Sequence, residues 1–292
     1  MLSSREKLGI ALGSAGVCLF GGTLPATRLA VSAIDPMFLT AASAAIAGCT
    51  GLLVLVALRR PIPRALIPGL ILTGAFTIVG FPVFLALAMM SVPAAHGGVV
   101  LGIIPLATVA AAALVTHERP SAGFWLASLA GAAIVVVFML RHQDSQGFAV
   151  GDLFLLGTVL SGAFAYALSG RMSMSMPGWE VICWQVTLYL PFSALATVWL
   201  WPHTFAGVPL PAWLGLAYVS FVSQFFAFFV LNAAMAIGGV ARVGQLMLLQ
   251  PFVIVALAAP VNGEPIEITT ILYAAAVVAV VIVGQRMRVK RG

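Results

Sequence analysis

Ten long apolar segments run through this 292-residue sequence and constrain its fold more than any other feature. Each is about 20 residues long, which is the length of an α-helix that crosses a hydrocarbon core of about 30 Å. Only 8% of the residues are charged, whereas a water-soluble domain carries about 25%. A soluble fold is therefore excluded, and the short connections leave no room for a soluble catalytic or ligand-capture domain.

The apolar segments predict membrane-spanning α-helices. A membrane β-barrel would alternate apolar and polar residues over about ten residues, whereas these runs are continuously apolar. We expect an α-helical bundle with spans at 8–31, 36–58, 66–90, 94–116, 122–140, 150–170, 179–200, 211–235, 240–260 and 266–284.

The basic residues predict the orientation of the bundle. When the ends and loops are assigned alternately to two sides, twelve of the 14 Lys and Arg residues fall on one side, and only Arg28 and Arg141 fall on the other. Cytoplasmic loops carry the excess of Lys and Arg in membrane proteins. Both termini are therefore expected in the cytoplasm, and the positive net charge is explained by topology rather than by binding to nucleic acid.

An internal repeat links the two halves of the chain. Pro105 followed by Glu118 recurs as Pro251 followed by Glu264, with both pairs offset by 146 residues. Met89 with Met235 and Gly98 with Gly244 match at the same offset. We therefore expect a duplicated unit, with boundaries at 1–143 and 144–292.

Five helices in each unit have a geometric consequence. An odd number of crossings makes the second unit enter the membrane from the opposite face, so the halves are inverted repeats. The predicted fold class is an all-α integral membrane protein with ten transmembrane helices in two inverted five-helix repeats. In secondary transporters, such inversion supports alternating access around a site near the bilayer midplane.

At this point the sequence resembles a known family. Two five-helix units, with the stretch 95–115 leading from Pro105 to Glu118 and into another apolar helix, are similar to the EamA-type members of the drug/metabolite transporter superfamily. The resemblance covers about 8–284. It implies a transporter of amino acids, other metabolites or sugar nucleotides, and the chain looks most similar to bacterial inner-membrane exporters of aromatic and other neutral amino acids.

Neutral polar and aromatic residues in the middle of the spans are candidates for a substrate cavity. An unpaired amide in lipid is costly, so it should face a partner helix or a wet cavity. Helix packing is the alternative for each residue, whereas several aromatic side chains around one site would suit an apolar amino-acid side chain. The candidates are Phe20, Thr23, Phe76, Phe81, Gly98, Leu101, Ser161, Phe164, Tyr166, Gln224, Gln245, Met247 and Gln250.

The two repeated prolines are candidate hinges. Pro105 and Pro251 are expected in mid-helix, where proline cannot donate to the carbonyl four residues earlier. The carbonyl oxygens of Leu101 and Met247 would then be free to bind a substrate ammonium group. The alternative is a kink whose carbonyl is satisfied by neighbouring hydroxyls or water.

Charged residues at the ends of the central helices are candidates for the two mouths of a pathway. His96 and Arg242 correspond at offset 146, and each could guide a substrate carboxylate, although an interfacial anchor is the alternative. Glu118 and Glu264 are expected to complement the N-terminal dipole of the helix that follows each of them.

The acidic residues favour facilitated transport. All carboxylates are expected in loops or at helix ends, with Asp152 at the start of the sixth helix, so a proton relay has no obvious place in the deep membrane. Proton-coupled export of a drug cation or another metabolite, and transport of a sugar nucleotide, remain as alternatives.

Other functional classes lack their required residues. The sequence has no HExxH motif, and its three cysteines lie within apolar stretches, so we expect no metal, no cofactor and no enzymatic activity. The expected partners are the lipid bilayer and the small-molecule substrate. The fifth and tenth helices carry almost no polar residues, which suggests a peripheral position and a possible homodimer interface there.

Overall fold

The computed structural model describes residues 4–116, 119–141, 150–173, 175–238, 249–286 and 289–290. Within these ranges, six helices are long and apolar enough to cross a membrane, and a seventh is added when a bent helix pair is counted as one span. The six are Lys7–Val31, Pro36–Ala57, Arg64–Met89, Val150–Met172, Gly178–Trp199 and Leu210–Leu231. A helical multi-pass membrane protein is thus supported, while the number of ten spans stays a prediction.

The first three spans lie where the apolar segments predict them. The first consists of α1 and α2, and the chain of hydrogen bonds continues between them through the Ala26 N–H to the Gly22 carbonyl. The second is capped by Asp35, whose Oδ1 accepts the N–H groups of Met37 and Phe38 at 2.9 Å each. The elements are α1 (Ser4–Gly21), α2 (Thr23–Val31), α3 (Pro36–Ala57), η1 (Arg64–Leu66), α4 (Ile67–Gly74), η2 (Ala75–Gly80) and α5 (Phe81–Met89).

The first three spans of the second half have the same order and a matching irregularity. The segments η2 and η3 are both π-helical, and each lies inside the third long helix of its half. Single π turns inside α-helices are rare and occur often at functional sites. The elements of the second half are α9 (Val150–Met172), α10 (Gly178–Trp199), α11 (Leu210–Ala217), η3 (Tyr218–Phe226) and α12 (Ala227–Gly238).

The span predicted at 94–116 is broken into α6 (Ala94–Leu101) and α7 (Ile104–Thr116), which are bent by 44°. The expectation of a proline in mid-helix is wrong here. The break falls at residues 102–103, and Pro105 lies in the first turn of α7, where a helix does not need the missing N–H. Pro251 likewise lies in the first turn of α14 (Gln250–Asn262).

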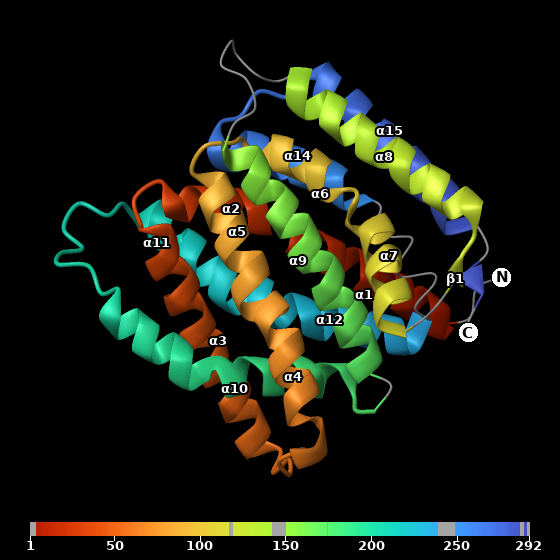
Figure 1. Cartoon of the computed structure of the whole chain (residues 1–292). Coiled ribbons are helices and arrows are strands. Elements are labelled where there is room, and N and C mark those ends of the chain that lie inside the picture. Colours follow the sequence, from red (N-terminus) through yellow and green to blue (C-terminus); the bar gives the residue numbers. More distant parts are fainter. Residues whose placement is uncertain are drawn as a thin grey trace.

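Two further helices lie side by side along one edge of the molecule (Figure 1). They are α8 (Ala122–Arg141) and α15 (Ile268–Arg286), the fifth and tenth predicted helices. A two-residue strand after α7, β1 (Arg119–Pro120), pairs antiparallel with β2 (Val289–Lys290). Apart from this short pairing and the turns, the described chain is helical.

The main helix contacts join the two halves of the chain. Helix α3 packs on α10, α1 on α12, α5 on α9, and α6 on α14. The largest apolar cluster includes Leu85, Val99, Leu106, Leu155 and Ile254. Helices α6 and α14 approach closely because Gly98 has no side chain, and a Cβ there would lie 2.7 Å from Ile254 Cγ2. The centre of the molecule is therefore an interface between the halves.

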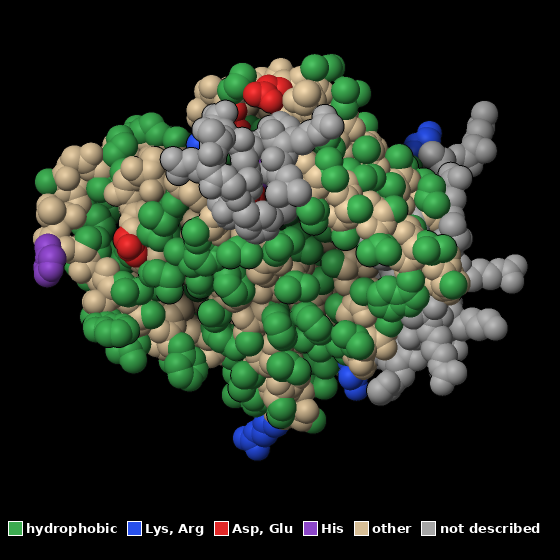
Figure 2. All heavy atoms as spheres, turned by 45° about the horizontal axis from the view of Figure 1, so that its top comes forward, with side chains coloured by type: hydrophobic (Ala, Val, Ile, Leu, Met, Phe, Trp, Pro, Cys, Tyr) green, Lys and Arg blue, Asp and Glu red, His purple; other side chains and the backbone are tan. Residues whose placement is uncertain are grey.

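Apolar side chains also cover the outside. Figure 2 shows them spread over most of one face. Exposed examples are Leu53 on α3 and Leu195 on α10, and Trp199 at the end of α10 is 86% exposed. In water such a surface would be unfavourable, whereas in a bilayer these side chains face hydrocarbon. The surface therefore agrees with the membrane assignment from sequence.

Candidate functional site

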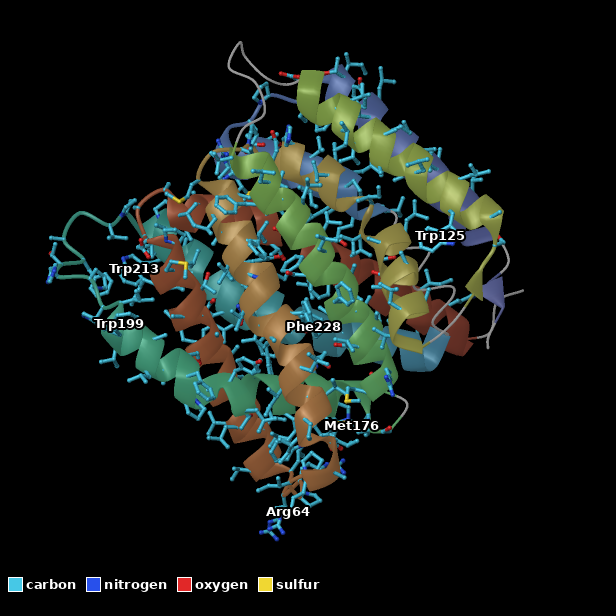
Figure 3. The ribbon with its side chains drawn as sticks, viewed as in Figure 1. Arg64, Trp125, Met176, Trp199, Trp213 and Phe228 are labelled. Atoms are coloured by element: carbon cyan, nitrogen blue, oxygen red, sulfur yellow. The ribbon has the colours of Figure 1, made fainter. Side chains whose placement is uncertain are left out.

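A cavity lies between the two halves of the chain. About 110 Å³ of it is accessible to the centres of water molecules. Its wall combines residues of α1, α2, α3, η2, α5, α6 and α7 with residues of α9, η3, α12 and α14. Phe228, labelled near the middle of the bundle in Figure 3, is one of the aromatic residues in this wall. The helices α8, α10 and α15 contribute none of its described lining.

The structure brings together most of the predicted cavity residues that it describes. Phe20, Thr23, Phe81, Gly98, Leu101, Tyr166, Gln224 and Gln250 line the cavity, and so does Pro251. Phe76 and Phe164 instead stack on each other, with ring centroids 5.2 Å apart. Ser161 packs beside Gly80, away from the cavity wall. Gln245, Met247, Arg242 and Glu118, and the side chain of Pro105, lie outside the described residues.

Sequence reasoning missed a group of small polar residues in the wall. Serine and threonine are common in packed membrane helices, so their sequence positions give no signal without knowledge of how each helix is rotated. The missed lining residues with a polar side chain are Thr27, Thr40, Ser43, Thr77, Ser169 and Ser223.

Two side-chain hydrogen bonds in the cavity wall bridge the halves. Thr23 Oγ1 on α2 donates to Ser223 Oγ on η3 at 2.9 Å. Gln224 Nε2, one residue further along η3, donates to Ser43 Oγ on α3 at 3.1 Å. The π-helical segment η3 thus presents consecutive polar residues to two helices of the first half.

Three threonine hydroxyl groups of the wall donate to carbonyls four residues earlier in their own spans. Thr27 donates to the Thr23 carbonyl at 2.8 Å, Thr40 to Pro36 at 2.9 Å, and Thr77 to Thr73 at 3.0 Å. A hydroxyl oxygen that donates its hydrogen still has lone pairs that can accept. Gln224 Oε1 is buried and has no hydrogen-bond partner among the described residues. The wall is therefore mostly apolar, and its few polar side chains include oxygens that can still accept hydrogen bonds.

Helix ends of opposite polarity also meet at the cavity. Helix α6 ends at Leu101, and Leu101 and Gly102 line the wall. Pro105 has no N–H to donate to the Leu101 carbonyl. The first turn of α14, with Gln250 and Pro251, lines the wall as well. A helix carries partial negative charge at its C-terminus and partial positive charge at its N-terminus, so these two ends favour ligand groups of opposite charge.

The cavity wall holds no Asp, Glu, Lys, Arg or His among the described residues. The same residues contain no group of three His, Cys, Asp or Glu side chains that could hold a metal ion. The polar chemistry available to a ligand here is therefore that of neutral side chains and backbone groups.

His96 does not lie at an open mouth as the sequence suggested. It is 8% exposed in the first turn of α6, and its Nε2 lies 2.9 Å from Oδ1 of Asp152 in the first turn of α9. Its ring packs against Phe138 of α8, with centroids 4.8 Å apart. Asp152 is 2% exposed, so this acid at a helix end is buried inside the protein.

Glu264 does not lie at the start of the following helix, where the sequence predicts that it complements the helix dipole. Helix α15 starts four residues later, at Ile268. The two carboxylate oxygens of Glu264 instead accept the N–H groups of Ala94 and Ala95 at 2.8 and 2.9 Å, which caps α6 in the other half. Its Oε1 also lies 3.2 Å from Nε of Arg28. Sequence spacing could not reveal this, because the cap lies 169 and 170 residues away.

A second ion pair joins the halves elsewhere. Arg60 Nη1, after α3, lies 3.3 Å from Glu180 Oε1 at the start of α10. The Arg60 guanidinium also sits over the ring of Trp179, 5.1 Å from its centroid. Like Glu264 with Arg28, this pair connects a basic residue of the first half to an acid of the second.

Comparison with known sequences decides the family. The sequence profile of the EamA-like transporter family matches this chain twice, at residues 7–140 and at 149–284. The chain belongs to the EamA-like transporter family. The two matches cover one half of the chain each and nearly all of it together.

Two comparisons place this EamA protein among known proteins. It is 38% identical over 276 residues to the uncharacterized transporter YdeK of Bacillus subtilis (strain 168), covering 94% of this chain and 96% of the relative. It also resembles a solved crystal structure whose title names no function, with a TM-score of 0.63, 23% identity, and coverage of 97% and 99% of the two chains. The latter shows likeness of fold alone. The family and the relative support a multi-pass membrane protein of a bacterial transporter family.

Proposed function

We propose that this EamA protein exports small zwitterionic metabolites, with aromatic and other neutral amino acids as the best match. The observation that carries the proposal is the cavity between the halves, which is mostly apolar and partly aromatic, contains a few hydrogen-bonding side chains, and is bordered by helix ends of opposite polarity. The relative's name says only that it is a transporter, so the substrate is argued from this chain's own residues.

Each part of a neutral amino acid has a matching surface in this cavity. An ammonium group donates hydrogen bonds, and in this proposal Gln224 Oε1, which has no described partner, and the carbonyl of the wall residue Leu101 accept them. A carboxylate suits the N-terminal turn of α14, because half-helix N-termini bind anionic substrate groups in transporters. Aromatic or aliphatic side chains suit the rings of Phe20, Phe81 and Phe228.

The competing substrates fit this wall less well. A sugar nucleotide carries phosphates, which Lys or Arg normally bind, and the described lining has neither. A drug cation would be favoured by a deep carboxylate, and the described lining has none. Acceptor groups alone would hold a cation weakly, so it stays the second candidate.

The repeats supply the mode of movement in this proposal. The units 1–143 and 144–292 act as inverted repeats, and exchange of their conformations alternates access to the cavity. The protein lies in the inner membrane of a bacterial cell, and both of its termini are in the cytoplasm. The outward faces of α8 and α15, which include exposed Leu129 and Leu272, contact lipid or a second copy of the chain.

Facilitated transport stays part of this proposal. It rests on the expectation that no carboxylate lies deep in the membrane, with Asp152 at the start of the sixth helix. Asp152 is buried at the start of a spanning helix and paired with His96.

The test is exchange of labelled phenylalanine in liposomes that contain the pure protein and are preloaded with unlabelled phenylalanine. We expect saturable exchange that methionine and threonine inhibit, and that UDP-glucose and tetraphenylphosphonium leave unchanged. Exchange inhibited by tetraphenylphosphonium alone would favour the drug-cation alternative. The absence of exchange above protein-free liposomes, with folded protein, would refute the amino-acid assignment.

A matched pair of variants links this activity to the cavity. Phe81→Ala removes a ring from the wall, and we expect the half-saturation concentration for phenylalanine to rise roughly tenfold while that for threonine changes little, because burial of an aromatic ring contributes a few kcal/mol at most. Phe76→Ala removes a ring that stacks outside the wall and should leave the preference for phenylalanine over threonine unchanged. Equal effects of both variants would contradict the assignment of the cavity.

A further inference from the structure

The π-helical segment η3 is hydrogen-bonded to the first membrane span at the junction between α1 and α2. Helix α1 ends at Gly21, and α2 begins at Thr23. Just before the junction, the Leu19 carbonyl accepts the hydroxyl of Tyr218 at 2.8 Å. Just after it, Thr23 Oγ1 donates to Ser223 Oγ at 2.9 Å. Two bonds to η3 therefore lie on either side of the junction, and both join the halves of the chain.

The π-helical geometry explains why one segment can make both bonds. Hydrogen bonds in a π-helix join residues five positions apart, and Tyr218 and Ser223 have this separation. On the first span, Leu19 and Thr23 are four residues apart, which is the separation of neighbours along one face of an α-helix. One turn of η3 thus matches one turn of the first span.

Two glycines make room for close contacts at this junction. A Cβ at Gly22 would overlap the hydroxyl of Tyr218, and a Cβ at Gly21 would lie 2.5 Å from Cγ1 of Val253 on α14. Pro25 in α2 has no N–H, so the Gly21 carbonyl lacks the donor that a helix normally supplies four residues later. The junction therefore has one helical hydrogen bond fewer, and side chains of the second half pack against it from two sides.

The junction positions two residues of the cavity wall. Phe20 and Thr23 lie on either side of it and line the cavity, as does Ser223 of η3, whereas Tyr218 lies outside the described lining. The ring of Phe20 packs edge-on against Phe228 in the wall, with centroids 5.0 Å apart. Because Tyr218 is bonded to the residue before Phe20, loss of its hydroxyl releases this part of the wall without removing a lining side chain.

We propose that Tyr218 is a positioning residue that sets the width of the cavity between the first span and η3, and thereby selects substrates by the size of their side chain. With the hydroxyl in place, Phe20 and Thr23 are held close to η3, so a small side chain contacts the wall. Without it, this side of the wall retreats, and a small side chain loses contacts that a large ring keeps. Selection by size rests on the proposed function, whereas the positioning of the junction does not.

Amide hydrogen exchange tests the positioning without any substrate. The N–H groups of Gly22 and Ala26 bond to the carbonyls of Cys18 and Gly22, so they span the junction. Tyr218→Phe removes only the hydroxyl, and we expect both N–H groups to exchange about threefold faster or more, because one hydrogen bond that holds the junction is lost. Unchanged hydrogen exchange at both groups would overturn the role of Tyr218.

Tyr189 provides a matched control. Its hydroxyl donates to the Ile71 carbonyl at 2.8 Å, and its ring lies where a Cβ at Gly74 would be. This bond also joins the halves, but α4 and α10 contribute none of the described cavity lining. Tyr189→Phe should therefore leave hydrogen exchange at Gly22 and Ala26 unchanged. An equal increase there in both tyrosine variants would contradict local positioning by Tyr218.

Transport in liposomes tests the selection by size. The measured quantity is the half-saturation concentration for threonine divided by that for phenylalanine. Tyr218→Phe should raise this ratio by about threefold or more, and Gly22→Ala, which displaces the same hydroxyl, should raise it too. Tyr189→Phe and Gly74→Ala should keep the ratio of the unchanged chain, although overpacking in Gly74→Ala lowers the melting temperature. A purely structural role would lower stability in all four variants and leave the ratio constant.

The outcomes separate this inference from the proposed function. Faster hydrogen exchange in Tyr218→Phe with an unchanged transport ratio would overturn the selection by size, and so would equal ratios in the Tyr218 and Tyr189 variants. If the folded, unchanged chain does not exchange phenylalanine at all, the amino-acid function fails and the selection by size fails with it. Hydrogen exchange at Gly22 and Ala26 still decides in that case whether Tyr218 positions the junction.

Discussion

At the scale of single residues, two glutamines show how the same side chain can differ in role. Gln224 lies in the cavity wall, donates to Ser43, and has an acceptor oxygen without a described partner. Gln185 on α10 is 0% exposed outside the cavity, and neither of its amide atoms has a described partner. A buried polar group without a partner costs stability, unless a ligand or another conformation satisfies it. Of the two, only Gln224 lines the cavity.

Gln224→Leu should weaken substrate binding. The change removes the bond to Ser43 and the oxygen that would accept from the substrate ammonium. Loss of a hydrogen bond to a charged group is worth about 1.5–3 kcal/mol, so the half-saturation concentration for phenylalanine should rise by roughly tenfold or more, measured by exchange in liposomes.

Gln185→Leu is the matched control for that change. It removes an amide that has no described partner, so the melting temperature in detergent should stay the same or increase, with unchanged half-saturation for phenylalanine. If Gln185→Leu weakened binding as much as Gln224→Leu, the distinction between the two glutamines would be refuted.

At the scale of elements, the short helix α6 is defined by contacts at both ends and along one face. Its N-terminus is capped by Glu264 of the other half, and its C-terminus ends at the cavity. Between them, Gly98 permits close packing on Ile254 of α14. Since an eight-residue helix is marginal by itself, these tertiary contacts determine where α6 begins, ends and points.

Gly98→Ala should destabilise the protein. The added methyl would lie 2.7 Å from Ile254 Cγ2, so α6 and α14 must separate or Ile254 must change rotamer. Overpacking of this kind costs about 1–3 kcal/mol, which should lower the melting temperature in detergent. Gly170→Ala in α9, where a Cβ meets no atom within 4 Å, should leave it unchanged or slightly higher. Equal melting temperatures for the two variants would contradict close packing at Gly98.

Glu264→Ala should loosen the start of α6. It removes the acceptors of two backbone N–H groups and the partner of Arg28. Loss of an N-terminal cap costs about 0.5–2 kcal/mol, so amide hydrogen exchange at Ala94 and Ala95 should become faster and the melting temperature should fall. The nearby exposed Glu267 provides the comparison, and Glu267→Ala should change neither quantity by a similar amount.

At the scale of the whole molecule, polar contacts hold the halves together around the cavity and near its ends. Thr23 with Ser223 bridges the halves beside the substrate space, while Arg28 with Glu264 and Arg60 with Glu180 bridge them outside it. Any conformational exchange between the halves has to break at least some of these contacts. Their geometry therefore indicates where a covalent link would stop transport.

A disulfide between the halves should block transport reversibly. Thr23 Oγ1 and Ser223 Oγ lie 2.9 Å apart, so cysteines at both positions are close enough for a bond that needs Cβ atoms about 3.8 Å apart. In a chain without the native cysteines, oxidation of Thr23→Cys/Ser223→Cys should abolish phenylalanine exchange, and reduction should restore it. Each single cysteine variant should be insensitive to oxidation. Full activity of the oxidised, cross-linked protein would contradict relative movement of the halves at this point.

The cavity residues show how far sequence reasoning reached and where it failed. Polarity in mid-span directed attention to Thr23, Gln224 and Gln250, which line the cavity, because a polar side chain is costly on a lipid-facing surface. The same reasoning could not separate Phe81, in the wall, from Phe76, which stacks on Phe164 outside it. The difference is the rotation of each helix, and a continuously apolar span carries no amphipathic pattern from which rotation can be calculated.

The sequence by itself determined the helical membrane class and the family, because apolar run length, low charge and the recurrence at offset 146 are properties of the chain that do not depend on packing. Only the tertiary structure decided that Glu264 caps α6, that Asp152 meets His96, and that a few polar side chains gather in the mostly apolar wall of the cavity. These features join residues tens to hundreds of positions apart. They depend on which helices meet and which faces they present, and those choices are made by contacts between the halves.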